Sequence, residues 1–163
     1  GPCAGRFYHL RPGHNGNPQG QRALCRFAAY DAWADALLQE SEFPKGAPLP
    51  MLMERLMCQA DGVTMIGERR QAYRFLQEQT GLSPQAKLEL EKAAQLFHEE
   101  SSLALQMGKV IGNMQMGEKQ ALALARREVR EELAQLIQEA KGLNMQAAAH
   151  MRQALQLQNR VVP

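Results

Sequence analysis

The sequence predicts an all-α protein, an antiparallel up-and-down bundle of four helices preceded by an irregular N-terminal arm. Apolar residues recur at steps of three or four along most of the chain, as they do on the buried stripe of an amphipathic helix. The stretches between these stripes are short and rich in Gly and Pro. The chain has 163 residues, 45% of them hydrophobic and 22% charged, which is enough to bury a core in one domain.

Residues 1–20 are expected to form an irregular arm or the tail of an upstream domain, because proline and glycine interrupt them repeatedly. The longest regular element expected there is a short strand over residues 6–10. Gly1 and Pro2 look like the remnant of a cleaved tag, so the native segment is expected to start near Cys3 and to belong to a longer protein. The helical bundle is expected to occupy residues 21–163.

The first two helices are predicted over residues 21–41 and 51–79. Prolines between residues 44 and 50 separate them, since each proline removes a backbone donor that a helix needs. The second helix contains Gly62 and Gly67, each of which weakens it by roughly 1 kcal/mol relative to alanine. The first helix is defined by an apolar stripe of Leu24, Phe27, Ala28, Ala34, Leu37 and Leu38.

The third helix is predicted from Pro84 to Ile111, because Gly81 suits a helix C-terminus and Ser83 an N-cap. The fourth helix is predicted to begin near Glu118 and to run through an apolar stripe from Val129 to Leu155. A division at Gly142 would make five helices. The uninterrupted stripe favours one long helix.

The charge pattern argues against nucleic acid and membrane partners. The 19 basic and 17 acidic residues are mixed along the chain, whereas a nucleic-acid footprint gathers its cations on one face. The densest basic group, Arg126, Arg127 and Arg130, is interleaved with glutamates and is interpreted as a solvated helix face. No uncharged run approaches the ~18 residues of a membrane span.

The cysteines and histidines indicate neither a metal centre nor a nucleophile. Cys3, Cys25 and Cys58 lack zinc-site spacing, and they are expected to be free thiols in a reducing compartment, the cytoplasm. Di-iron bundles need Glu-x-x-His pairs, but His98 and His150 follow Gln and Ala at that spacing. We therefore expect no catalytic residue, metal or cofactor, and the chain alone is not expected to be an enzyme.

Charged residues that interrupt the apolar stripes indicate a candidate site more clearly than the cysteines and histidines do. Asp31 lies on the apolar face of the first helix, Asp61 and Arg69 lie on the second, and Glu100 lies on the third. Because an unpaired buried ion costs several kcal/mol, a structural ion-pair network is favoured over a ligand pocket. If a small-molecule site exists, it is expected at these charges, with the lining Asp31, Trp33, Asp61, Arg69, Tyr73 and Glu100.

Several stretches together resemble a known family. They are residues 29–37 (AYDAWADAL), Glu68-Arg69 with Ala72 and Phe75-Leu76, Ala93-Ala94 with Glu99-Glu100, and residues 127–130 (REVR) leading to Glu139-Ala140. Over most of residues 22–155 the chain resembles the all-helical C-terminal half of some bacterial cysteine-peptidase-like proteins of the papain-like superfamily. In those proteins a catalytic Cys–His half comes first, and no catalytic residue carries over to this chain. The resemblance implies an accessory helical domain.

Three functional hypotheses follow. The first is a non-catalytic module that binds a partner protein or an adjacent domain through its helix faces, with oligomers as one form of such binding. The second is a small-molecule or cofactor site between the helices, a common place for ligands in bundles. The third is the accessory half of a cysteine-hydrolase-like enzyme.

Overall fold

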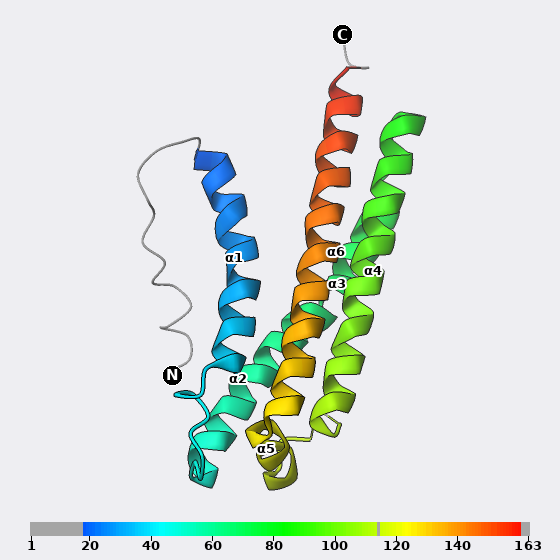
Figure 1. Cartoon of the computed structure of the whole chain (residues 1–163). Coiled ribbons are helices and arrows are strands. Elements are labelled where there is room, and N and C mark those ends of the chain that lie inside the picture. The colour runs from blue at the N-terminus through cyan, green and yellow to red at the C-terminus, as the bar shows by residue number, and fades with distance from the viewer. Residues whose placement is uncertain (1–17, 114, 161–163) are drawn as a thin grey trace. The chain divides into compact units, whose positions relative to one another are not determined.

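The structure is a computed structural model that describes residues 18–113 and 115–160, with side chains described from Phe27 onward. These residues form helices and connecting loops, and no strand occurs among them (Figure 1). The predicted all-α fold class is therefore confirmed. The helices are α1 (Pro18–Leu38), α2 (Leu49–Gly67), α3 (Arg69–Gln77), α4 (Pro84–Ile111), α5 (Glu118–Ala125) and α6 (Arg127–Asn159).

The chain divides into two compact units. Unit 1 contains the described residues up to Gln59 and those from Val110 to Gln138. Unit 2 contains Ala60 to Lys109 and the described residues from Glu139 onward. Helices α2, α4 and α6 contribute residues to both units.

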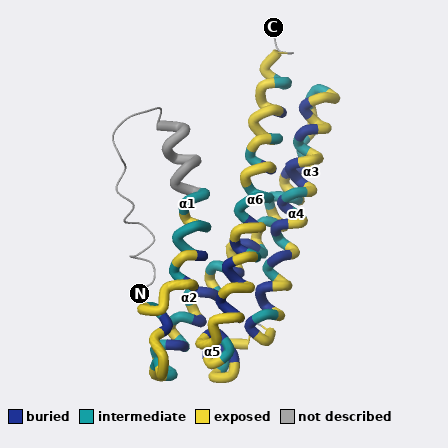
Figure 2. The backbone as a smooth tube through the Cα atoms, viewed as in Figure 1, coloured by how far each residue is buried: buried dark blue, intermediate teal, exposed yellow. Residues whose placement is uncertain are grey.

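The core of unit 1 is built by α1, the first part of α2, α5 and the first part of α6. Its buried side chains include Leu37, Phe43, Leu52, Leu56, Leu124, Val129, Leu133 and Ile137. Figure 2 colours the buried residues dark blue along the backbone. The positions of Val129, Leu133 and Ile137 on α6 follow the predicted stripe, so the helical period identified the buried face correctly.

The core of unit 2 joins α3, α4 and α6. Leu76 from α3 and Phe97 from α4 form a buried cluster with the small side chains of Ala93, Ala94 and Ala147. Ala72, Tyr73, Leu90 and Leu96 pack against this cluster. Alanine at the contact positions leaves room for the larger aromatic ring, so the helices can pack closely around Phe97.

The first two predicted helices differ from the structure at their ends. Helix α1 begins at Pro18, a residue suited to the first helical turn, and ends at Leu38. The rest of the predicted arm, including the strand over residues 6–10, lies outside the described residues. The second predicted helix is two helices, because the N–H of Gln71 bonds the carbonyl of Glu68 three residues back and interrupts the α-helical ladder there.

The third helix begins and ends as predicted, from Pro84 to Ile111. The Oγ of Ser83 accepts a 3.3 Å hydrogen bond from the N–H of Ala86, as an N-cap does. Gly81 has a φ of +73°, a conformation that glycine adopts without strain.

The fourth predicted helix is interrupted, but not at Gly142. Arg126 has an extended backbone with φ −76° and ψ 130°, which separates α5 from α6. Helix α6 then continues without a break through Gly142 to Asn159. The prediction that the helix continues unbroken across Gly142 is thus confirmed. The prediction that it runs without a break from Glu118 is wrong. No described helix combines the length and apolarity needed to cross a lipid bilayer.

Candidate functional site

A buried carboxylate joins three helices within unit 2. Glu100 on α4 has no exposed area, and its Oε2 accepts a 2.8 Å hydrogen bond from the side-chain amide of Asn144 on α6. Its Oε1 lies 3.4 Å from Nε of Arg69 on α3, whose side chain is 37% exposed. The predicted ion-pair network is therefore confirmed for Arg69 and Glu100. Asn144, which supplies the shorter contact, was not predicted.

An aromatic pair lies in the same unit. The rings of Tyr73 on α3 and His98 on α4 are tilted against each other with centroids 5.0 Å apart. Nδ1 of His98 is buried and has no hydrogen-bond partner among the described residues. The carbonyl of His98 accepts hydrogen bonds from the hydroxyls of Ser101 and Ser102. The imidazole thus contributes by ring packing, and no carboxylate orients it for proton transfer through Nδ1 within the described residues.

A second buried carboxylate, Glu89, also joins α4 to α6. Its Oε2 lies 2.6 Å from Nδ1 of His150, and its Oε1 lies 2.6 Å from Nζ of Lys92. The hydrogen bond from Lys92 is the main cause that lowers the pKa of Glu89, and the His150 contact lowers it further against the effect of burial. Both contacts favour the ionised carboxylate, and the contact with His150 ties α4 to α6.

In unit 1 a buried arginine holds two helix ends. Arg130 on α6 is 2% exposed, and its Nε donates a 2.8 Å hydrogen bond to the carbonyl of Leu37 in the last turn of α1. Its Nη1 donates to the carbonyls of Leu124 (3.4 Å) and Ala125 (2.6 Å), at the end of α5. The guanidinium also lies 4.6 Å from the ring centroid of Phe43. The solvated face predicted for residues 126–130 is wrong for Arg130.

Arg130 accounts for the interruption at Arg126. Because the last carbonyls of a helix have no partner within it, an internal charged donor can replace the missing hydrogen bonds. The sequence pattern did not reveal this, since arginine among glutamates at helical spacing is typical of a solvent-exposed face.

The six predicted site residues do not belong to one unit. Asp31 and Trp33 lie in unit 1, where Asp31 accepts a hydrogen bond from Gln138 and the indole N–H of Trp33 donates to Gln59. In unit 2, Arg69 and Glu100 contact each other, Tyr73 contacts His98, and Asp61 is exposed to solvent. Of the six, Arg69 and Glu100 are in direct contact.

The cysteine interpretation requires a correction. Cys58 on α2 is disulfide-bonded, so the predicted free thiol is wrong at this position. Its partner sulfur lies outside the side chains that the structure describes, as do Cys3 and Cys25. Spacing misled at this position because a disulfide can join cysteines that lie far apart in sequence. Within the described part of the chain, no three His, Cys, Asp or Glu side chains gather as metal ligands would.

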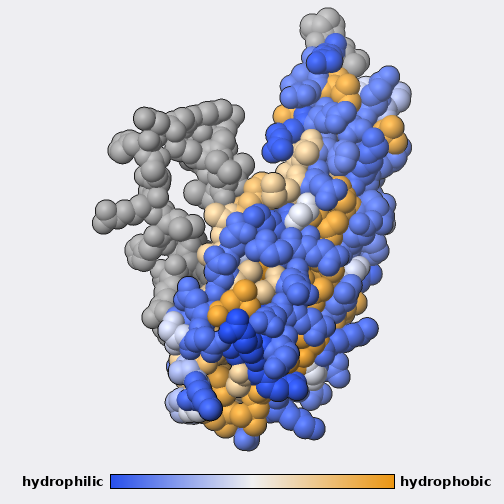
Figure 3. All heavy atoms as spheres, viewed as in Figure 1, coloured by the Kyte–Doolittle hydropathy of each residue, from blue (hydrophilic) through white to orange (hydrophobic). Residues whose placement is uncertain are grey.

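The outward surface of α6 in unit 2 exposes apolar side chains. Met151 is 38% exposed and Leu155, one turn further on, is 62% exposed. Hydrophobic atoms accordingly interrupt the hydrophilic surface along this part of the helix (Figure 3). We call the half-buried Ala148 together with Met151 and Leu155 the α6 apolar stripe.

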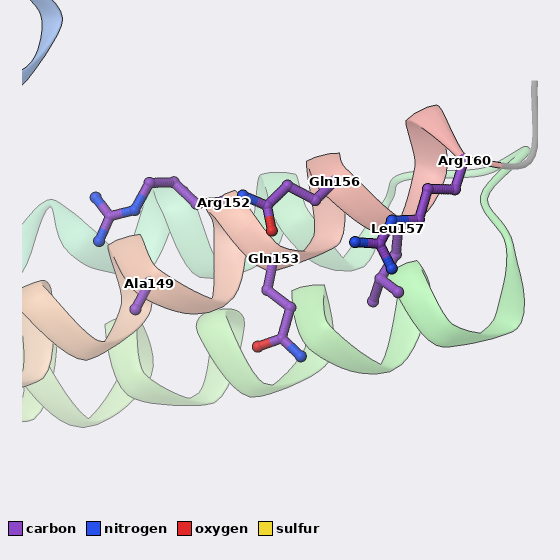
Figure 4. Close-up of a pocket in the computed structure, with 6 residues that line it drawn as sticks. All are labelled: Ala149, Arg152, Gln153, Gln156, Leu157 and Arg160. Carbon is purple, nitrogen blue, oxygen red and sulfur yellow. The ribbon is translucent and has the colours of Figure 1, made fainter.

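A shallow hollow lies beside this stripe on the same helix. Arg152 and Arg160 lie at its two ends, with Gln153 and Gln156 between them, and Ala149 and Leu157 complete the lining (Figure 4). Neither arginine forms an ion pair within the described residues. The sequence does contain a signal for this surface, because residues 140–163 contain no Asp or Glu.

The end of α6 is held in place within unit 2. The side-chain oxygen of Gln158 accepts a 2.9 Å hydrogen bond from the N–H of Ser83, and its amide nitrogen lies 3.5 Å from the carbonyl of Gly81. The apolar stripe and the hollow are therefore presented by an anchored helix.

Comparison with models of known protein families, with curated proteins and with solved structures finds no match for this chain.

Proposed function

We propose that this chain is a protein-interaction module and that its partner binds the outward face of α6 in unit 2. The observation that carries the proposal is the α6 apolar stripe, where Met151 and Leu155 are exposed one helical turn apart. Single exposed apolar residues are common, but a stripe beside a polar hollow has the composition of a binding surface, with an apolar centre and a polar rim.

The anchored end of α6 supports this proposal. Gln158 bonds backbone groups at Ser83 and Gly81, so the surface needs little ordering when a partner binds. A surface that is already ordered loses less conformational entropy on association, and more of the contact energy then becomes affinity.

The small-molecule hypothesis has less support from the described residues. Arg69, Glu100 and Asn144 pair with one another, so their polar groups are used in holding α3, α4 and α6 together. The described residues that line the hollow, by contrast, come from α6 and from Arg160 directly after it. The hypothesis of an accessory half of a cysteine-hydrolase-like enzyme rests on the resemblance alone, and the coding sequence upstream of Cys3 tests it.

The experiment is site-specific photo-crosslinking in the native cell. A photoreactive amino acid replaces Leu155 in one version of the tagged chain and Leu105 in another, and mass spectrometry identifies the crosslinked proteins. Leu105 is the matched control because it is an exposed leucine on α4, at 72%. A protein captured at position 155 is then purified and titrated against the wild-type chain, L155E and L105E.

The proposal expects direct binding to the wild-type chain that weakens at least tenfold in L155E and less than twofold in L105E. Circular dichroism melts of both variants establish that each is folded. Identical capture at positions 105 and 155, or equal affinity of L155E and wild type, would contradict the proposal.

The cellular compartment is a separate question. A cytoplasmic location remains a prediction, and the disulfide at Cys58 weakens its basis because disulfides persist mainly in oxidising compartments. Alkylation of thiols in intact cells before lysis, followed by peptide mapping, tests it: a cytoplasmic chain would carry the alkyl group on Cys58.

A further inference from the structure

The charges around the α6 apolar stripe indicate the chemistry of the partner. Residues 140–163 contain the cations Lys141, Arg152 and Arg160 and not one carboxylate side chain. Arg152 and Arg160 line the hollow and form no ion pair within the described part of the chain. Exposed Arg127 on the same helix lies instead against Glu40 and Glu131. The last part of α6 therefore carries cations without a carboxylate side chain of its own.

We propose that the partner presents an acidic amphipathic helix to this surface, an inference that rests on the proposed function above. Ala148, Met151 and Leu155 are spaced three and four residues apart, the spacing at which one helix receives the apolar side chains of another. Arg152 lies next to Met151 and one turn from Leu155, so a carboxylate flanking the partner's apolar residues meets its guanidinium.

The spacing of the two arginines adds a constraint on the partner. From Arg152 to Asn159, the last residue of α6, the helix rises by about 10 Å at 1.5 Å per residue, and Arg160 follows directly. A partner helix that runs alongside α6 matches both when its carboxylates are about two turns apart. Gln153 and Gln156 lie between the arginines and offer amide groups to polar residues at the rim (Figure 4).

Other occupants fit this surface less well. A second copy of α6 would bring Arg152 and Arg160 against like charges, since no carboxylate side chain lies in residues 140–163 to receive them. Nucleic acid binding draws its affinity from many phosphate contacts, whereas the hollow offers two guanidinium groups.

The test uses the intact chain and two fluorescein-labelled synthetic peptides measured by fluorescence anisotropy. Each peptide has 22 residues with Leu at helical i, i+3 and i+4 positions; one carries Glu at the flanking positions and the other carries Lys. The protein variants are R152E/R160E and the control R70E/R74E. The control makes the same change in net charge at two exposed arginines of α3 that also form no ion pair within the described residues.

The proposal expects the Glu peptide to bind at least tenfold more tightly than the Lys peptide, with an affinity that falls as salt is added. R152E/R160E should weaken the Glu peptide at least tenfold and R70E/R74E less than twofold. Equal binding of the two peptides, or equal losses in the two variants, would overturn the inference. Vesicles of phosphatidylcholine and phosphatidylserine form a further arm, and binding to them that depends on Arg152 and Arg160 would assign the surface to lipid instead.

The two proposals fail in different ways. If a captured partner loses affinity in L155E but not in R152E/R160E, the interaction surface stands and its preference for acidic helices is wrong. If position 155 captures no specific partner, the proposed function itself fails, whatever the peptides do.

Discussion

The side-chain amide of Asn144 on α6 donates a 2.8 Å hydrogen bond to the fully buried carboxylate of Glu100 on α4. Removing this donor takes a short contact from a buried charge, whereas Arg69 lies farther away at 3.4 Å and is partly in solvent. We therefore expect the contacts of Asn144 and Arg69 with this carboxylate to contribute differently to the free energy of unfolding.

We expect Asn144→Ala to lower the free energy of unfolding by about 2 kcal/mol, because a buried acceptor loses its partner. Arg69→Met should cost about 1 kcal/mol or less, the usual range for a partly exposed ion pair. Urea denaturation of both variants measures the difference. A larger loss in Arg69→Met than in Asn144→Ala would show that the ion pair outweighs the amide contact.

Arg130→Met should be among the most damaging single substitutions in unit 1. Its side chain donates to carbonyls at the ends of α1 and α5, and the apolar replacement leaves them unpaired at a cost of about 3 kcal/mol. Arg127→Met is the control, because Arg127 is exposed and its ion pairs are screened by solvent, so their loss should change stability little. Similar thermal melts for the two variants would contradict a capping role for Arg130.

Glu89 should make stability depend on pH in the acid range. The pKa of Glu89 is lowered by hydrogen bonds from Lys92 and His150, so the unfolded chain takes up the proton first as the pH falls. Its stabilisation is complete above the ordinary value of 4.5 and is lost as the pH falls from there through the lowered pKa of the folded state.

The variant Glu89→Gln should flatten this part of the stability profile, measured by urea denaturation at a series of pH values. Glu91→Gln, at an exposed position on the same helix, serves as its control. An unchanged slope in Glu89→Gln would mean that other carboxylates cause the acid dependence.

Gly142→Ala should stabilise the chain by about 0.5–1 kcal/mol. Gly142 lies inside α6, and a Cβ added there meets no atom within 4 Å, so alanine brings its helix preference without a clash. Gly81→Ala should instead cost about 1 kcal/mol, because Gly81 has a φ of +73°. Calorimetric melting temperatures that move in the same direction for both variants would contradict this contrast.

The candidate site was only partly predictable from sequence. Arg69 and Glu100 were recognised because charges on an apolar stripe must find partners, and they find each other. The contacts of Asn144 and Gln158 could not be predicted, since a neutral amide on a helix does not reveal from the sequence which group it will bond. Asp31 and Trp33 were grouped with them by helical face alone, and the fold places these two in the other unit.

By itself the sequence determined the all-α class, the extent of α4, the continuity of α6 across Gly142 and the burial of Val129, Leu133, Ile137, Ala140 and Ala147 on α6. These features depend on the 3.6-residue period and on capping residues, which are local. The predicted buried stripe is wrong at Met151 and Leu155, which are exposed. Only the tertiary structure decided the end of α5 at Arg126, the burial of Arg130, the disulfide at Cys58 and the anchoring of α6 by Gln158. Each depends on a contact between residues far apart in sequence or on opposite sides of a helix end, and no local pattern records such a contact.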